Sequence, residues 1–514
     1  MVRTRRGVGA MLKQKSEEYR GFRTPGIRLS EELLPDVVEH RTDRVLVTLY
    51  AFHAFDKAHL VMLAEERLIP LGDAAAMLRV LRETERLGIE QARLEAGGGM
   101  HSGEQVLIRR LSEEVGGRIH LGRSSGDLGV VSTRIVQRDK LLDVLLHLNR
   151  VRSAVISQAE AHVDTVMPGY THGQHAQPTT LGHQLAAWAA VLERDFERAV
   201  QAYRRINVSP AGAAILTGSN FPLNRHRTSE LLGFDRPAPS TFDAILSHDT
   251  ELDSFCVLAI LNADLGRWAE DLMLWSTSEF GMVDVPDRYC GTSSIMMQKK
   301  NPYAPQYIKG LGAASLGGLV TAFHAEKGPT GMPILDRQYS RDALWRLYDD
   351  TVRDLSWVHD LLPALRWNTS LMRARAGEHW AQATDIAGAL VREKGLPWRT
   401  AHQIVGILVR VGYERGIGPA DVTPDLLDEA AVAYMGRPVG LSEESLRKAV
   451  DPENFVRERA IFGGPAPQEV LRRLADFRAT LARDEATYTD ARQRVDEARR
   501  KLESAIDALV GSEP

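Results

Sequence analysis

The chain has 514 residues, enough for about two to four domains, and its 44% hydrophobic and 26% charged residues are ordinary for a globular protein. The formal net charge of -4 argues against a general affinity for nucleic acid or for anionic membranes. The chain has two cysteines, so we expect no disulfide framework. It has no apolar signal-peptide core and no run near the ~18 apolar residues of a membrane span, and we therefore expect a cytoplasmic protein.

The hydrophobic pattern is helical along most of the chain. Residues 1–30 are predicted to be loosely ordered, while 41–68 and 74–94 repeat apolar residues at helical spacing, and the glycines at 97–99 predict a loop after them. Strand patterns are nearly absent, so the predicted fold class is all-α. We predict an N-terminal helical domain over 1–117, a central helix-bundle domain over 118–363, a small helical C-terminal domain over 364–475 and an extra C-terminal helix over 476–514.

The last helix carries an apolar stripe with alternating three- and four-residue steps, which Asp484 interrupts. Such a stripe indicates either a helix packed along its own subunit or an intermolecular coiled coil. The members of the stripe are Leu474, Phe477, Leu481, Tyr488, Ala491, Val495, Ala498, Leu502, Ala505 and Leu509.

The stretch Gly291–Pro302, GTSSIMMQKKNP, concentrates hydroxyl, ammonium and carboxamide groups in one predicted loop. A hydroxyl near cations ionises more easily, because positive charge favours its anionic form. Lys299 and Asn301 would then hold charge that develops on a bound carboxylate. A solvated basic turn is the alternative interpretation.

This stretch resembles the GSSxMPxKxNP loop of the fumarase/aspartase superfamily, most closely the SSIMPQKKNP form of argininosuccinate lyases. Thr292 and Met297 depart from that pattern. The resemblance implies that Ser293 is the catalytic base, that Lys299 is catalytic, and that Ser294 and Asn301 contact the substrate.

Two other segments resemble the remaining motif loops of the same family. HLGRSSGD, at 120–127, is similar to HTGRSRND, which implies substrate contacts for Ser124 and Ser125, although Ser125 replaces an Arg and the next residue, a glycine, replaces an Asn. PGYTHGQHAQP, at 168–178, is predicted to be a loop between two long helices and is similar to PGYTHLQxAQP. There Thr171 would bind a substrate carboxylate and His172 would protonate the leaving group. We expect no metal site at this segment, since no carboxylate or thiolate follows at ligand spacing.

Further departures from argininosuccinate lyases fall near the implied pocket. His248 replaces an Arg, Gln306 stands where a Glu bonds the motif His, and Pro333 replaces a Tyr that helps to hold the arginine moiety. Gln338 is retained, and Arg341 is a basic substitute for Lys. His248, Gln306, Gln338 and Arg341 are therefore expected to contact the substrate.

The resemblance implies a three-domain fold with a long central helix bundle, assembled as a homotetramer whose active sites take motif loops from different subunits. It implies a carbon–nitrogen lyase acting on a small carboxylate or amino-acid adduct, without metal or cofactor. The accumulated departures favour a specialised relative over a genuine argininosuccinate lyase. A non-catalytic scaffold is the alternative of another class.

Overall fold

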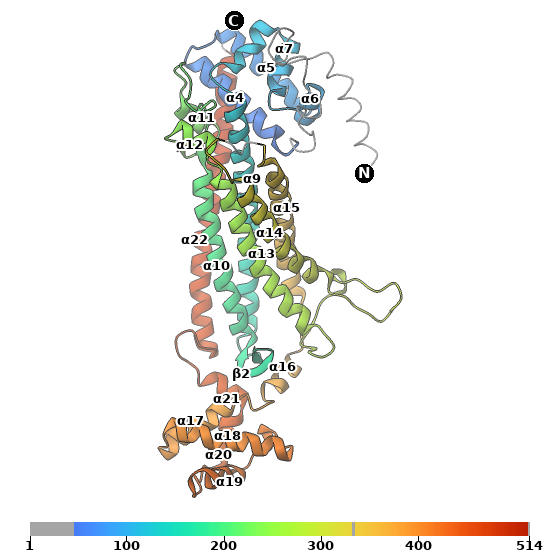
Figure 1. Cartoon of the computed structure of the whole chain (residues 1–514), viewed down its shortest axis with the longest axis vertical. Helices are drawn as coiled ribbons and strands as arrows, with labels where there is room; N and C mark the ends of the chain where they lie inside the picture. The colour runs from blue at the N-terminus through green and yellow to red at the C-terminus, as the bar shows by residue number, and fades with distance from the viewer. Residues whose placement is uncertain (1–45, 332–334, 512–514) are drawn as a thin grey trace.

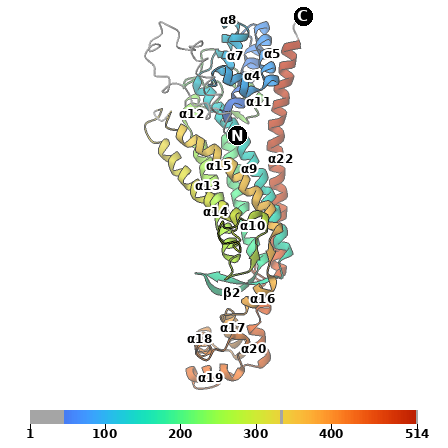
Figure 2. The ribbon, with the colours of Figure 1, turned by 90° about the vertical axis from the view of Figure 1, so that its right-hand side faces the viewer.

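The structure is a computed structural model that describes residues 46–331 and 335–511. It is elongated, with long helices in the middle and a group of shorter helices at each end (Figures 1 and 2). The loose order predicted for residues 1–30 falls outside the described residues. No helix of the described ranges is long and apolar enough to cross a membrane.

The N-terminal group packs short helices over one end of the bundle. The glycine loop predicted at 97–99 is confirmed: Gly97 and Gly98 adopt positive φ between two of these helices. The elements are η1 (Leu46–Thr48), α4 (Leu49–Glu65), α5 (Leu71–Leu87), α6 (Ile89–Glu95), α7 (Ser102–Arg110), α8 (Glu113–Gly116) and η2 (Gly117–His120).

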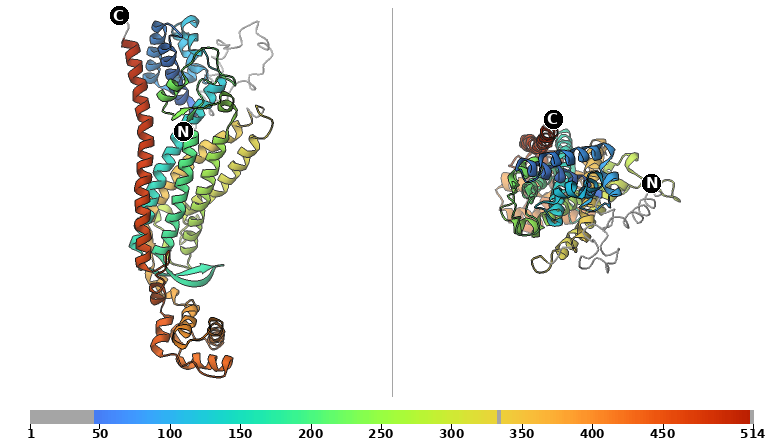
Figure 3. Two further views of the ribbon diagram at one scale, coloured as in Figure 1. Left: turned by 90° about the vertical axis from the view of Figure 1, so that its left-hand side faces the viewer. Right: turned by 90° about the horizontal axis from the view of Figure 1, so that it is seen from above.

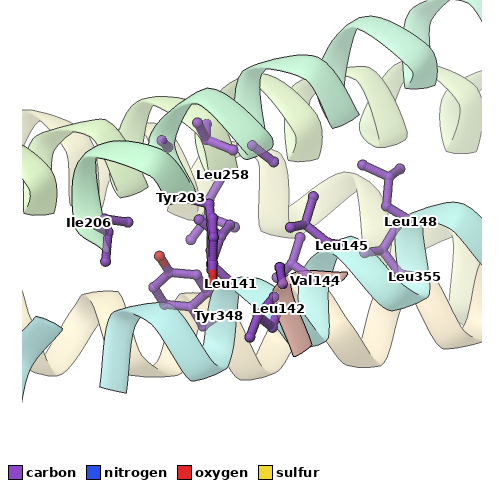
Figure 4. Close-up of a cluster of buried hydrophobic side chains, with 14 of the residues drawn as sticks. Leu141, Leu142, Val144, Leu145, Leu148, Tyr203, Ile206, Leu258, Tyr348 and Leu355 are labelled. Atoms are coloured by element: carbon purple, nitrogen blue, oxygen red, sulfur yellow. The ribbon is translucent and has the colours of Figure 1, made fainter. Parts of the chain in front are cut away.

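Five long helices form the bundle: α9 (Ser125–Ala161), α10 (Leu181–Ile206), α13 (Asp249–Trp275), α14 (Tyr303–Ala325) and α15 (Gln338–Leu361). Leucines and tyrosines from α9, α10, α13 and α15 meet in its core (Figure 4). Burial of such a face, more than helix propensity, stabilises helices of this length. The predicted all-α class is confirmed.

Short elements connect the bundle helices. At the end near the N-terminal group, β3 (Val208–Ser209) pairs in parallel with β4 (Arg236–Pro237), followed by α12 (Thr241–Leu246), with α11 (Arg225–Leu231) between the two strands. At the other end, β5 (Val283–Asp284) pairs antiparallel with β6 (Arg366–Trp367). The 3₁₀ turns η3 (Asp287–Tyr289) and η4 (Leu362–Ala364) complete these connections.

The segment between α9 and α10 is a β-hairpin, so the prediction of a loop there is wrong. β1 (Val166–Thr171) pairs antiparallel with β2 (Gln174–Thr180), with an irregularity between Pro168 and Tyr170. Its two-residue turn has φ of 55° at His172 and 71° at Gly173, the positive values that a type I′ hairpin turn requires. The alternation typical of strands is weak here because polar residues occupy both faces.

The C-terminal group has a hydrophobic core of its own, separate from that of the bundle. Trp380, Ile386 and Leu408 are among its buried members. Its helices are α16 (Thr369–Ala376), α17 (Ala383–Lys394), α18 (Trp398–Arg415), η5 (Pro419–Asp421), α19 (Pro424–Met435), α20 (Glu443–Val450) and α21 (Pro452–Arg457).

The last helix, α22 (Pro467–Gly511), returns along the whole bundle to the N-terminal group (Figure 3). It begins at Pro467 rather than at the predicted boundary of 476, since proline is favoured in the first turn of a helix. The predicted stripe packs against the chain's own α9 and α10, and Asp484 inside it accepts a 2.7 Å hydrogen bond from the buried Arg152. The interpretation as a helix on its own subunit therefore holds.

Candidate active site

The loop Gly291–Pro302 projects from the side of the bundle between α13 and α14 (Figure 1). Two backbone hydrogen bonds, of 2.9 and 2.8 Å, join Gly291 to Asn301 and close its base. A Cβ at Gly291 would lie 1.9 Å from the ring of Tyr303, so this close approach requires glycine. At the tip, Ile295 and Met297 are 81% and 88% exposed.

Ser293 lies in a tight turn of this loop, where its Oγ accepts hydrogen bonds from the backbone N–H groups of Ile295 (3.3 Å) and Met296 (3.0 Å). Hydrogen bonds to an anion favour the charged form of a group. These two amides are therefore placed to stabilise a serine alkoxide, and the sequence motif alone did not indicate them.

The two neighbouring ammonium groups of the loop have different surroundings. Lys300 lies 2.7 Å from Asp284 and 2.8 Å from Asp287, and hydrogen bonds to these carboxylates raise its pKa. Within the described part of the chain, Lys299 forms no ion pair. Lys299 is thus the ammonium available to a ligand, whereas Lys300 anchors the loop to the segment before it.

Thr171 and His172 are exposed at the tip of the β1–β2 hairpin. The ring of Tyr170, next to them, contacts that of Phe280 at a centroid distance of 5.8 Å. Phe280 and the Ser293 loop both follow the end of α13. The hairpin and the Ser293 loop therefore lie at the same end of the bundle.

Ser124 and Ser125 lie at the opposite end, at the start of α9. Ser124 Oγ accepts from the N–H of Gly126 (3.3 Å), and Asp127 accepts from the N–H of Ser124 (2.8 Å), a capping box that explains why the long helix begins here. Ser125 is exposed, and its Oγ lies 2.9 Å from Nε2 of His101.

His248, Gln338 and Arg341 also lie at this end, where α13 and α15 begin. Arg341 donates to both carboxylate oxygens of Glu251, and His248 Nδ1 lies 3.0 Å from the same carboxylate. Burial alone would raise the pKa of Glu251, but the adjacent Arg341 and His248 bring it to about 2. The structure therefore places His248 and Arg341 in a buried ion-pair cluster, with Arg341 the more exposed of the two.

The predicted site residues thus fall into two sets at opposite ends of α9. Its 37 residues separate Ser124 from the hairpin by about 55 Å along the helix axis. Gln306 lies exposed near the start of α14 with the hairpin set, and no hydrogen bond joins it to His172 among the residues described. One chain therefore does not bring the three motif loops together.

The structure brings together two groups of side chains that could ligate a metal ion. The sequence alone did not connect the members of either group. One is His101, Glu104 and His120; the other is His175, Glu378 and His379. The carboxylate beside His175 comes from a distant segment, which spacing along the sequence does not reveal. His101 immediately precedes α7 and Glu104 lies in the first turn of that helix, so their i,i+3 spacing was a signal available in the sequence.

Comparison with known proteins identifies the family. A profile described as "Lyase" matches residues 68–317, and one described as "Argininosuccinate lyase C-terminal" matches residues 380–457. The chain is 36% identical to the argininosuccinate lyase of Methanocaldococcus jannaschii over 87% of this chain and 91% of the relative. It is 35% identical to that of Methanosarcina acetivorans over 93% and 96%.

Among solved structures, an EDDS lyase in complex with formate superimposes with a TM-score of 0.84 at 32% sequence identity, covering 91% of this chain and 92% of that one. Fold, motif loops and relatives agree, and they confirm the resemblance found in the sequence. The chain is a lyase that belongs to the fumarase/aspartase superfamily, in its argininosuccinate lyase-like branch.

Proposed function

We propose that this lyase eliminates an amine from a succinyl-type adduct of an amino acid or related amine, giving fumarate or a similar unsaturated acid, or that it catalyses the reverse addition. The observation that carries the proposal is the Ser293 hydroxyl held by two backbone amides, with the ammonium of Lys299 six residues further along the same loop. An EDDS lyase variant of the same fold, also 32% identical, has been solved with bound fumarate.

In the proposed reaction, Ser293 as an alkoxide removes the proton on the carbon beside a carboxylate. Charge then develops on that carboxylate, where Lys299 and Asn301 stabilise it. As the carbon–nitrogen bond breaks, its electron pair goes to nitrogen, and His172 donates the proton that the departing amine requires. Thr171 and Ser294 bind the carboxylates. The chemistry proposed for these side chains needs no metal or organic cofactor.

The proposal includes a homotetramer with shared active sites, supported by the apolar surface of α14. Leu316, Val320 and Phe323 follow one another at four- and three-residue spacing on this helix and are 59%, 51% and 53% exposed. A contiguous apolar face of this kind marks a contact with another protein surface. Association of chains would also bring loops from opposite ends of different chains together.

We propose a specialised relative with a changed substrate pocket. Ser125 and the glycine after it stand where the family pattern has an Arg and an Asn that contact the substrate. His248 stands where the pattern has another Arg near the pocket. The substitution at Pro333 falls outside the described residues. A genuine argininosuccinate lyase is the second candidate, favoured by the names of the relatives at 35–36% identity.

The test is an ultraviolet absorbance screen for fumarate formation on a panel of succinyl-amines that includes argininosuccinate. We expect turnover of a compound other than argininosuccinate, and Ser293→Ala should reduce kcat by about 10³-fold or more while the oligomer stays intact. Turnover of argininosuccinate alone would favour the second candidate. Silence across the panel would favour a scaffold, and unchanged kinetics in Ser293→Ala would remove this serine from the mechanism.

A further inference from the structure

Three side chains with metal-ligating atoms converge where the β1–β2 hairpin meets the turn between α16 and α17. His175 lies on β2, while Glu378 and His379 lie in the turn, and α16 packs against the hairpin (Figure 1). Their ligand atoms all lie within 4.8 Å of one another. The centroids of the two imidazole rings are 4.7 Å apart. The sequence alone predicts no metal site here, because the carboxylate belongs to a distant turn.

The position of His175 is set by aromatic neighbours. Tyr170 is its partner across the hairpin, and the two rings meet edge to face with centroids 5.1 Å apart. Tyr170 in turn contacts Phe280, in the segment after α13, at a centroid distance of 5.8 Å. Two ring contacts in series therefore hold the imidazole of His175 in place on the hairpin.

The turn that carries the other two side chains has a fixed backbone conformation. His379 and Trp380 have φ of 55° and 60°, in the left-handed region that residues with a Cβ rarely adopt. Trp380 is 6% exposed and belongs to the core of the C-terminal group, so burial of its indole stabilises this conformation. The side chains of Glu378 and His379 remain exposed beside the hairpin.

The three side chains converge without being bonded to their surroundings. Among the described residues, none of them forms a side-chain hydrogen bond or an ion pair, and Nδ1 of His175 is a buried atom without a partner. Burying a polar nitrogen without a partner costs free energy, which a ligand at that nitrogen would offset. The other group differs in this respect, because Nδ1 of His120 already lies 3.1 Å from the carboxylate of Glu104.

The charges at the hairpin group suit a divalent cation. Burial lowers the pKa of His175, and the neighbouring His379 and Arg375 lower it further, so the ring is neutral near pH 7 and keeps a lone pair for a metal ion. Glu378 supplies negative charge. Arg375 donates to two backbone carbonyl oxygens of the segment after α13, at 2.8 and 2.9 Å, so its N–H groups already have acceptors there.

We propose that His175, Glu378 and His379 bind a divalent transition-metal ion, with Zn²⁺ as the ion that fits, and that this ion joins the β1–β2 hairpin to the turn before α17. Two imidazole nitrogens and one carboxylate oxygen are a ligand set that Zn²⁺ uses, with a fourth position left for water. Ligand atoms of a tetrahedral ion with bonds of about 2.1 Å lie about 3.4 Å apart. Rotation of the two exposed side chains in the turn closes the difference.

The bound ion restrains the hairpin that also carries Thr171 and His172. A 3.3 Å hydrogen bond from Gln177 on β2 to Thr384 on α17 already joins the same two parts of the chain, and the ion adds a second and stronger link. The inference goes beyond the proposed function and does not depend on it, because none of the three ligands takes part in the proposed reaction.

The test is a calorimetric titration of the full-length protein, without a histidine tag, with ZnCl₂ at neutral pH in a buffer that does not chelate the ion. We expect one strong site per chain. His175→Gln, Glu378→Gln and His379→Gln should each weaken Zn²⁺ binding by about 100-fold or more, because even groups that only orient a metal ligand contribute about 10- to 100-fold. The matched control is His120→Gln, in the other group, which should bind Zn²⁺ as the wild type does.

Hydrogen exchange of the backbone amides gives a second, local measurement. Zn²⁺ should slow exchange in residues 166–180 and 377–382 of the wild type. It should not do so in His379→Gln, whose exposed side chain can be replaced without disturbing the fold. Slower exchange at both segments would show that the ion joins the hairpin to the turn.

Three results would overturn the inference. They are the absence of a strong Zn²⁺ site in the wild type, equal Zn²⁺ affinity in the wild type and the three ligand variants, and loss of binding in His120→Gln alone, which would assign the ion to the group around Glu104. Each of these results leaves the proposed function intact, because the kinetics of Ser293→Ala test that function separately.

Discussion

At the scale of single residues, Lys299 and Lys300 are adjacent but chemically distinct. Lys300 is held between Asp284 and Asp287, at 2.7 and 2.8 Å, whereas its neighbour has no such pair in the described ranges. The sequence shows only two consecutive lysines. The ion pairing of Lys300, which leaves Lys299 for the proposed catalytic role, depends on two aspartates placed by the turn η3 and the strand β5.

We predict that Lys299→Met lowers kcat by about 10²- to 10³-fold, because it removes one group that stabilises the developing negative charge. Lys300→Met should lower kcat only a few-fold, since an exposed ion pair contributes about 0–1 kcal/mol. Both are measured with the succinyl-amine that gives turnover in the screen. Equal losses in the two variants would show that the pairing of Lys300 does not separate their roles.

The motif loops could be recognised in the sequence because each is a local pattern, and the roles assigned to their residues stay predictions. Ser293, Lys299, Thr171 and His172 could each be identified within a dozen residues. The contact of Ser125 with His101 could not, because it spans two elements 24 positions apart and depends on how α7 packs against α9. His248 and Arg341 were expected to face the substrate, and their shared contact with Glu251 also depends on packing between helices.

At the scale of elements, helices were predicted well and the hairpin was not. Long helices such as α10 and α13 show a 3.6-residue apolar period, which reports the face they bury. The hairpin β1–β2 has prolines at 168 and 178 and polar residues on both faces, so its stability comes from tertiary contacts such as Tyr170 with Phe280. Its two-residue turn, with Gly173 in second position, was the available local signal.

The packing of α22 on its own subunit predicts a specific effect of a core substitution. Ile506, near its C-terminal end, is fully buried against the N-terminal group. Ile506→Ala should reduce the free energy of unfolding by about 2–5 kcal/mol, measured by urea titration, because it leaves a cavity.

The oligomeric mass of Ile506→Ala should remain unchanged by light scattering. Ser504→Ala, an exposed position on the same turn, is the control and should change stability by less than about 0.5 kcal/mol. A fall in mass accompanying the loss of stability would instead indicate that this helix joins subunits.

At the scale of the whole molecule, the separation of the motif loops is the main consequence of the fold. The sequence motifs occur in the family's order, yet α9 holds Ser124 about 55 Å from the hairpin that carries His172. Nothing in a single sequence shows how chains associate. The apolar face of α14, with Leu316 and Phe323 exposed, is the structural feature that supports association.

Shared active sites predict that two inactive variants restore activity when their chains are mixed. Ser293→Ala and His172→Gln, each nearly inactive alone, are unfolded together and reassembled in equal amounts. If each site takes Ser293 from one chain and His172 from another, random association leaves about a quarter of the sites with both native residues. Turnover should therefore recover to about that fraction of the wild-type value.

The matched control for this mixing is Ser293→Ala with Lys299→Met. These substitutions lie in one loop, so every mixed site receives either one or the other, and we expect no recovery. Recovery in neither mixture, with oligomers of normal mass, would mean that one chain supplies both His172 and Ser293 to each site. The distance along α9 would then still require a second chain for Ser124, and mixing Ser293→Ala with Ser124→Ala, provided that the latter is itself inactive, would restore turnover.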